Sequence, residues 1–266
     1  MMLGRLPLIG VVALAAMMCG PGIALAEVQA GHLNPVAGPV VADNLSKSYN
    51  WAGYATQPGT DTVSKVSAKW TVPAIECTSK HPMASFWIGI DGFSTPNAAS
   101  NTVEQIGTIA QCSGSTPTYF SWYEMYPAQS SIQTLGTVSP GDDISATVSY
   151  DSMTALFTVS MKDTTSEASW REVSANPGSR DMSAEWIVER PSGSTDPGGF
   201  YPLSDFGTFT FSSCKATISG VTGGISSFPP VYVITMVNYK SGDRTLASPS
   251  ALTSGDKFVI TWDHPD

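Results

Sequence analysis

The stretch Ala184–Glu189 carries two glutamates, and their spacing limits the chemistry they can do together. Its β-branched and aromatic residues alternate with a period of two, which predicts a strand. Glu185, Ile187 and Glu189 then share one face, and Trp186 points to the other, into the core. Because a strand rises about 3.3 Å per residue, the two glutamates lie roughly 13 Å apart. They cannot act together on one atom, so whichever is functional needs a partner from another strand.

The same alternation gathers polar and aromatic side chains on one face of neighbouring predicted strands. These side chains are Trp87, Gly89 and Asp91, then Val103, Gln105, Gly107 and Ile109, then Trp122, Glu124 and Tyr126. Glycines inside strands often mark the close approach of another group, which favours a ligand groove. The pattern also fits a solvent-facing sheet, in which Gln105 and Glu189 are ordinary exposed residues. The tryptophans also fit core positions.

Several familiar catalytic sets are missing from the chain. Outside the N-terminal region, His81 adjoins Pro82 and His264 lies two residues after Trp262, so neither has the context of a triad base. No Gly-x-Ser-x-Gly, Cys-x-x-Cys or His-Glu-x-x-His motif occurs, and we predict neither a metal nor a cofactor. Carboxylates, amides and aromatic side chains remain. They could bind a sugar, hydrolyse one with two carboxylates such as Glu124 and Glu189, or hydrolyse a peptide.

The N-terminus reads as a targeting signal. Arg5 precedes the apolar run Leu6–Met18, and Ala24–Ala26 forms a small-x-small cleavage site, which predicts a signal peptide over residues 1–26. The apolar run is too short for a membrane span. We therefore expect a secreted, extracellular protein with no membrane attachment after cleavage. Residues 27–45 are mostly small or polar and include two prolines, Pro35 and Pro39, which is typical of a flexible leader or a short pro-segment.

Residues 46–266 have the length of one all-β domain. Removal of Arg5 with the signal takes the formal charge from −9 to −10, and only 13% of residues are charged. A chain with so few bases is a poor partner for nucleic acid. Few carboxylate–cation pairs also favour stability in acid. We expect a monomer.

Three cysteines remain after the signal: Cys77, Cys112 and Cys214. In an oxidising compartment a Cys77–Cys112 disulfide is preferred, with Cys214 buried and inert, although the sequence leaves the pairing open.

Short strand-like runs separated by turn residues fill the domain, without an amphipathic helix. The predicted strands are 63–72, 84–90, 102–109, 118–126, 144–150, 156–161, 184–188, 206–211, 231–237 and 257–262. Many short strands at close spacing are typical of an antiparallel sandwich or barrel.

Ordered motifs along the chain resemble a known family. They are Asn50-Trp51-Ala52-Gly53, Trp87-Ile88-Gly89-Ile90-Asp91-Gly92, Gln105-x-Gly107, Trp122-Tyr123-Glu124-x-Tyr126-Pro127, Ala184-Glu185-Trp186-Ile187-Val188-Glu189 and Phe206-Gly207-Thr208-Phe209-Thr210-Phe211. In order and spacing they resemble the glutamic peptidases, or eqolisins, which are secreted acid endopeptidases. The resemblance implies an all-β fold, an antiparallel two-sheet β-sandwich of the concanavalin or lectin-like jelly-roll type, with a concave groove for polypeptide substrates.

The resemblance also implies roles for individual residues. Gln105 and Glu189 match the catalytic glutamine and glutamate, and this motif favours Glu189 over Glu185 as the base. The remaining motif residues are implied to bind substrate: Trp51, Gly53, Trp87, Asp91, Gly107, Trp122 and Glu124. Taken alone, Asp91 fits a turn residue that bonds its own backbone, and Glu124 a buried support.

Three positions depart from the fungal members of the family. Ile109 and Phe120 stand where those members tend to have aspartates, and Pro191 replaces an aromatic residue near the catalytic glutamate. We expect these changes to affect the pH optimum and side-chain preference more than the type of reaction.

The predicted reaction needs no histidine, metal or serine. Ionised Glu189 takes a proton from water, the water attacks the peptide carbonyl, and Gln105 donates to the oxyanion. The alternatives are a carbohydrate-binding, lectin-like module with Trp51, Trp87 and Trp122 as stacking platforms, and a glycosidase that uses two carboxylates.

Overall fold

The computed structural model describes residues 44–59, 62–77, 81–93, 95, 101–129, 131–193, 199–240 and 244–265. The predicted signal peptide and almost all of the predicted leader lie outside these ranges. The first strand begins at Leu45, the last residue of that leader.

Strands make up most of the described chain, and the one helix among these residues is a short 3-10 turn, η1 (Ile225–Ser227). The strands are β1 (Leu45–Ser48), β2 (Trp51–Thr56), β3 (Val63–Thr71), β4 (Met83–Ile90), β5 (Val103–Ser113), β6 (Thr116–Tyr126), β7 (Gln133–Thr137), β8 (Asp143–Asp151), β9 (Leu156–Asp163), β10 (Ser169–Ser174), β11 (Ala184–Glu189), β12 (Thr208–Ile218), β13 (Val221–Gly224), β14 (Val231–Val237), β15 (Thr245–Pro249) and β16 (Phe258–Trp262). No helix in the described ranges is long and apolar enough to cross a membrane.

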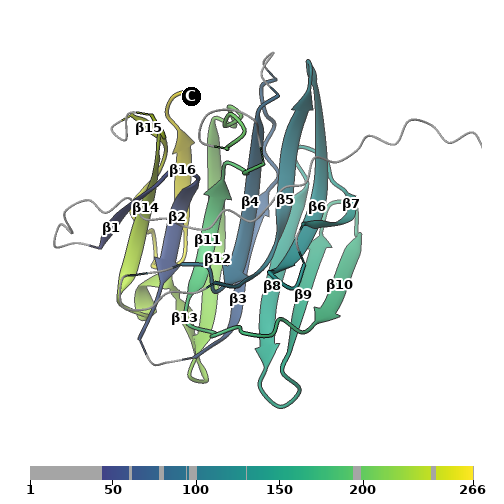
Figure 1. Ribbon diagram of the computed structural model, residues 1–266. Coiled ribbons are helices and arrows are strands. Elements are labelled where there is room, and N and C mark those ends of the chain that lie inside the picture. The colour runs from purple at the N-terminus through teal and green to yellow at the C-terminus, as the bar shows by residue number, and fades with distance from the viewer. Residues whose placement is uncertain are drawn as a thin grey trace, which may run out of the picture.

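The strands form two layers that share one long strand (Figure 1). One layer runs β10-β9-β8-β3-β12, and the other runs β12-β16-β15-β14-β2-β11-β4-β5-β6-β7. The pairs along both are antiparallel, while β1 joins β14 in parallel. The register of β12 with β3 shifts between Ser212 and Lys215, and Ser213 has a φ of 52°. This irregularity lets one half of β12 pair with β16 and the other with β3. The predicted all-β sandwich is confirmed.

The main core lies between the two layers. Trp70, Phe157 and Phe211 from the first layer pack with Phe86 and Trp186 from the second. The predicted inward direction of Trp186 is confirmed, because the residue is fully buried and its Nε1 donates to the carbonyl oxygen of Ser67 at 3.1 Å. Alternate residues of β2, β4, β5, β6 and β11 therefore point to the opposite side, away from the first layer.

That opposite side, which we call the site face, has its own buried cluster. The cluster consists of Trp51, Ala55, Trp87, Phe93, Val103, Ile109, Phe120, Trp122, Ile187 and Ile234. It contains no residue from β3, β8, β9 or β10. The period-2 assignment of Ile187 and its neighbours to one face is thus confirmed by packing.

The preferred cysteine pairing is also confirmed. Cys77 and Cys112 form a disulfide, and Cys214 is free and buried. Cys112 lies near the end of β5, so the bridge ties the segment after β3 to the sheet that carries the site face.

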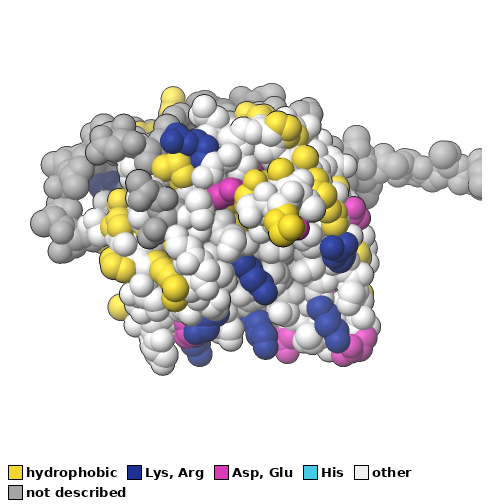
Figure 2. Space-filling model, turned by 90° about the horizontal axis from the view of Figure 1, so that it is seen from below, with side chains coloured by type: hydrophobic (Ala, Val, Ile, Leu, Met, Phe, Trp, Pro, Cys, Tyr) yellow, Lys and Arg dark blue, Asp and Glu magenta, His cyan; other side chains and the backbone are white. Residues whose placement is uncertain are grey.

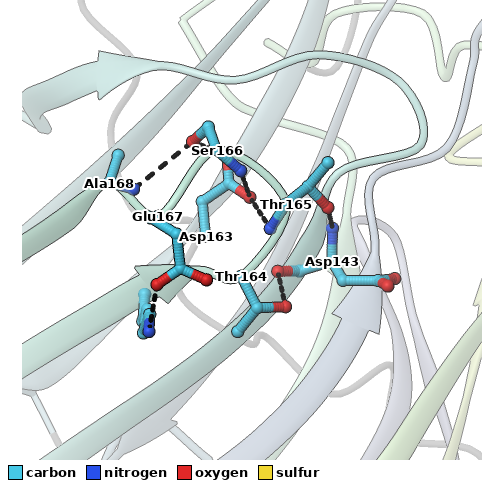
Figure 3. A network of polar contacts seen from close by, with 8 residues as sticks. Asp143, Asp163, Thr164, Thr165, Ser166, Glu167 and Ala168 are labelled. Carbon is cyan, nitrogen blue, oxygen red and sulfur yellow. Dashed lines mark hydrogen bonds and ion pairs between the residues drawn. The ribbon is translucent and has the colours of Figure 1, made fainter.

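Polar side chains close the turn between β9 and β10 (Figure 3). One carboxylate oxygen of Asp163 accepts from the backbone N–H groups of Thr165 and Ser166 at 2.8 and 3.1 Å, and the other from the Ser166 hydroxyl. Lys162 and Glu167 form an ion pair beside them. Seen from below, Lys and Arg side chains are spaced singly over the visible face and do not form one continuous basic patch there (Figure 2).

All ten predicted strands are present. The described structure also contains strands that were not predicted: β1, β2, β7, β10, β13 and β15. Strands β7 and β10 are short, lie at sheet edges and are largely exposed, so their residues lack the apolar alternation of half-buried strands. β12 runs seven residues past the predicted end at Phe211, through its bend at Ser213.

Candidate active site

Strand pairing brings the predicted site residues into rows across the site face. One row consists of Ala55, Glu185, Gly89, Gln105 and Glu124 on β2, β11, β4, β5 and β6. The next consists of Gly53, Ile187, Trp87, Gly107 and Trp122, and the third of Trp51, Glu189, Ser85, Ile109 and Phe120. Gln105 and Glu189 therefore lie on one face of one sheet, two strands and four residue positions apart.

Glu189 is held by two N–H donors from different parts of the chain. Trp87 Nε1 donates to its Oε2 at 2.8 Å, and Asn50 Nδ2 donates to its Oε1 at 3.3 Å. Both donors favour the ionised carboxylate. Trp87 also lies in the row between Glu189 and Gln105, so its indole spans part of the distance between them.

Asn50 is a site residue that the sequence reasoning did not single out, although it opens the first motif. Ser48 Oγ donates to Asn50 Oδ1 at 3.0 Å, which turns the amide nitrogen toward Glu189. The same hydroxyl accepts from the backbone N–H of Trp51 at 3.1 Å. The pattern Ser48-x-Asn50-Trp51 would have been the sequence signal.

Gln105 contacts Glu124, its register partner on β6. Gln105 Nε2 donates to Glu124 Oε2 at 2.9 Å, and both side chains are fully buried. Gln105 Oε1 accepts no hydrogen bond within the described ranges. The structure therefore brings Gln105, the predicted oxyanion donor, into contact with Glu124, for which a buried supporting role was the alternative interpretation.

The tryptophans and glycines of the site face fit around one another. Trp51 and Trp87 pack edge to face, with ring centroids 4.9 Å apart. A Cβ at Gly107 would lie 2.5 Å from Trp87 Cβ, and one at Gly89 2.9 Å from Trp87 Cζ3. The close approach that these glycines were expected to mark is thus filled by Trp87. Gly53 has a φ of 149°, and a Cβ there would lie 2.1 Å from the Trp186 carbonyl oxygen, so strand packing alone requires glycine.

The interpretation of this face as a solvated sheet is wrong. Gln105 and Glu124 are fully buried, and Glu189 is 3% exposed. Trp122 is buried too, and its Nε1 has no hydrogen-bond partner within the described residues. Buried donors and acceptors interact more strongly than exposed ones, because less water competes for them.

Asp91 fastens the segment that leads into β11. Its carboxylate accepts from the backbone N–H groups of Arg180, Asp181 and Met182 at 2.7, 3.0 and 2.9 Å. The hydroxyls of Thr102 and Ser179 donate to it as well. Asp91 is fully buried and has a φ of 64°. The Asp91 carboxylate thus accepts hydrogen bonds from residues 179–182, which lie at least 88 positions further along the chain. Its predicted contact with substrate stays a prediction.

Two other buried acids, Glu185 and Glu104, have raised pKa values and are influenced by the charge of Asp91. Burial raises the pKa of Glu185 well above its ordinary value, and the charge of Asp91 adds to the effect. Burial also raises the pKa of Glu104 well above its ordinary value, with Asp91, Asp181 and Glu185 adding to it and a hydrogen bond from Asn176 opposing it. Glu185 is therefore neutral in mild acid and is unsuited to act as a general base.

Comparison with known proteins identifies the family. The model of the peptidase A4 family matches residues 49–262. The chain belongs to the peptidase A4 family. The fold of this A4 peptidase resembles a crystal structure of Scytalido-glutamic peptidase with a peptide-based transition state analog, at 22% identity and a TM-score of 0.66. The match covers 81% of this chain and 98% of that chain.

Two further structures resemble this A4 peptidase. SCP-B, described as a member of the eqolisin family of peptidases in a complex with the tripeptide Ala-Ile-His, is 21% identical with a TM-score of 0.64, covering 81% of this chain and 98% of that one. Aspergilloglutamic peptidase from Aspergillus niger is 27% identical with a TM-score of 0.56, covering 68% and 99%. No curated protein matches the chain. This A4 peptidase is a peptide-bond hydrolase of the glutamic type.

The departures from the fungal pattern lie near the predicted base of this A4 peptidase. Ile109 and Phe120 are register partners on β5 and β6, in the row of Glu189, and both belong to the buried apolar cluster. Pro191 follows β11, and its carbonyl oxygen accepts from the backbone N–H of Tyr201 at 2.9 Å. The site face is thus apolar where β5 and β6 cross this row, whereas the register partner of Glu189 on β4 is Ser85. In the described part of the chain, no group of three or more His, Cys, Asp or Glu residues could hold a metal ion.

Proposed function

We propose that this A4 peptidase is a secreted acid endopeptidase in which Glu189 activates water and Gln105 stabilises the oxyanion. The observation that carries the proposal is the shared face: Glu189 and Gln105 project from β11 and β5 to the same side of one sheet, with Trp87 between them and bonded to Glu189. The match to the family model over residues 49–262 supports it.

The two side chains do not contact each other in the structure. Two strand spacings and four residues along a flat sheet separate their Cα atoms by roughly 16 Å. Gln105 Nε2 faces Glu124 on β6, and Glu189 accepts from Trp87, so the proposed reaction places the water and the peptide carbonyl between the two groups.

In the proposed reaction, ionised Glu189 takes one proton from water as the water oxygen bonds to the carbonyl carbon. The carbonyl oxygen becomes an oxyanion and accepts from the amide N–H of Gln105. Protonated Glu189 then gives its proton to the leaving nitrogen, and the carbon–nitrogen bond breaks. The products are a carboxylic acid and an amine, and Glu189 returns to its ionised form.

The environments of the two glutamates on β11 support Glu189 as the base. N–H groups from Trp87 and Asn50 favour the ionised form of Glu189. Burial and the charge of Asp91 keep a proton on Glu185. A base that is ionised in mild acid, beside an acid that stays neutral, suits hydrolysis below neutral pH.

Digestion of casein or haemoglobin between about pH 2 and 7 tests the proposal with three variants. Glu189→Gln should abolish cleavage while the protein stays folded, and Gln105→Ala should lower kcat by about 100-fold, as loss of an oxyanion donor does. Glu185→Gln is the matched control and should retain cleavage. Cleavage by Glu189→Gln at the wild-type rate would refute the assignment.

Secretion and processing are tested separately, by expressing the full chain with its own residues 1–26. We expect the protein in the culture medium with an N-terminus at Glu27, or near Ser46 if residues 27–45 are a pro-segment that is removed. Retention of residues 1–26 in the exported protein would contradict the signal-peptide prediction. Light scattering of the purified protein tests the expected monomer.

A further inference from the structure

The buried pair formed by Gln105 and Glu124 includes a carboxylate that the reaction above does not use. The two residues are register partners on β5 and β6, and neither side chain is exposed. Gln105 Nε2 donates to Glu124 Oε2 at 2.9 Å. Within the described ranges, no other side chain forms a hydrogen bond with the Gln105 amide.

We propose that Glu124 is a positioning residue that fixes the orientation of the Gln105 amide. The inference rests on the proposed function, because it assigns the cause of the Gln105 geometry that the reaction needs. Glu124 Oε2 is the acceptor in this hydrogen bond, whereas the Gln105 amide has a donating nitrogen and an accepting oxygen. Glu124 therefore selects the orientation in which Nε2 faces β6, and it disfavours the orientation rotated by 180°.

The selected orientation leaves two groups of Gln105 available for the reaction. One N–H is bound by Glu124, and the second N–H on the same nitrogen can donate to the oxyanion. Oε1, which accepts no hydrogen bond in the described part of the chain, can accept from the attacking water or from a substrate N–H. Donors that are fixed before the reaction need no reorganisation as charge develops, which is why a fixed amide is a better catalyst than a rotating one.

Among the strand neighbours of Gln105, Glu124 is the one that can orient its amide. On the β4 side the register partner of Gln105 is Gly89, which has no side chain that could form a hydrogen bond with the amide. Glu104, the adjacent residue in β5, points to the opposite face and accepts from Asn176 Nδ2. The carboxylate that holds the amide therefore comes from β6, from the motif Trp122-Tyr123-Glu124.

Two substitutions of Glu124 separate positioning from substrate binding. Glu124→Met removes the acceptor at similar length, and we expect kcat to fall by about 10- to 100-fold, the loss typical of removing one partner of a buried hydrogen bond, with little change in KM. Glu124→Gln keeps an acceptor oxygen, and we expect it to recover most of that kcat. Both are assayed on a chromogenic peptide, with circular dichroism and thermal unfolding to show that they are folded.

Glu104→Gln is the matched control, because it alters a buried glutamate one residue from Gln105 that does not contact its amide. We expect it to change the unfolding temperature and leave kcat unchanged. A folded Glu124→Met protein with wild-type kcat would overturn the proposal. So would a rise in KM alone, which would make Glu124 a substrate-binding residue. If Glu189→Gln is inactive in the same assay, either result refutes only the positioning role, whereas an active Glu189→Gln refutes the proposed function itself.

Discussion

Raising the pH should destabilise this protein, because two glutamates are buried with their protons. Burial is the main cause of the raised pKa values of Glu104 and Glu185, and both side chains are fully buried. In the unfolded chain each would lose its proton near the ordinary glutamate pKa of about 4.3. Above that pH the folded state holds more protons than the unfolded state, so the free energy of unfolding falls as pH rises.

The size of the effect follows from the number of retained protons. Each one lowers the free energy of unfolding by about 1.4 kcal/mol per pH unit, so two give about 2.7 kcal/mol per unit until the folded-state pKa values are reached. Asp163 acts in the opposite direction. Burial raises its pKa, but hydrogen bonds from Ser166 and Thr165 outweigh burial and lower it. Its stabilisation is present above about pH 3.9 and is lost as the pH falls through the lowered value, so we expect maximal stability near pH 4.

Urea denaturation followed by tryptophan fluorescence tests this slope between about pH 4.5 and 6.5. The measurements use the Glu189→Gln protein, so that self-digestion does not interfere. Glu104→Gln and Glu185→Gln should each reduce the slope by about 1.4 kcal/mol per pH unit, since an amide does not titrate. Glu172→Gln, at an exposed position on β10, should leave the slope unchanged. A flat curve for the Glu189→Gln parent protein, or equal slopes in all variants made from it, would refute this explanation.

Three further predictions concern single contacts. Trp87→Phe removes the 2.8 Å hydrogen bond to Glu189 and should lower kcat/KM by about 10- to 100-fold, measured on a peptide substrate with the fold checked by circular dichroism. Replacing Cys77 and Cys112 with serine opens a loop with a sequence separation of 35 and should lower the free energy of unfolding by about 4 kcal/mol; a loss below 1 kcal/mol in urea denaturation would contradict the chain-entropy argument. Asp91→Ala removes the acceptor of three backbone N–H groups and should destabilise the protein by at least about 3 kcal/mol, and wild-type stability would show that another group accepts from them.

Much of the site-bearing sheet could be predicted because its pattern is local. Alternation in Ala184–Glu189 places Ile187 on one face and Trp186 on the other, and packing confirms both. The same alternation cannot tell a solvated face from a buried one when both are mixed in polarity. For that reason the exposed interpretation of Gln105 and Glu189 was wrong.

The edge strands could not be predicted for a different reason. β10 is mostly exposed, and its pairing with β9 depends on backbone hydrogen bonds, which the side-chain pattern does not encode. The segment that Asp91 holds is likewise defined by backbone N–H groups, so no motif in the chain marks it as the partner of Asp91.

By itself, the sequence determined the all-β class, the two faces of the strand that carries Glu189, and the order of motifs that marks the family. Only the tertiary structure decided that Glu189 lies between N–H groups 102 and 139 residues away, and that Gln105 faces Glu124. The reason is physical. Which face a side chain takes follows from its neighbours in the strand, whereas its contacts follow from register, which is fixed by pairing and packing across the whole sheet.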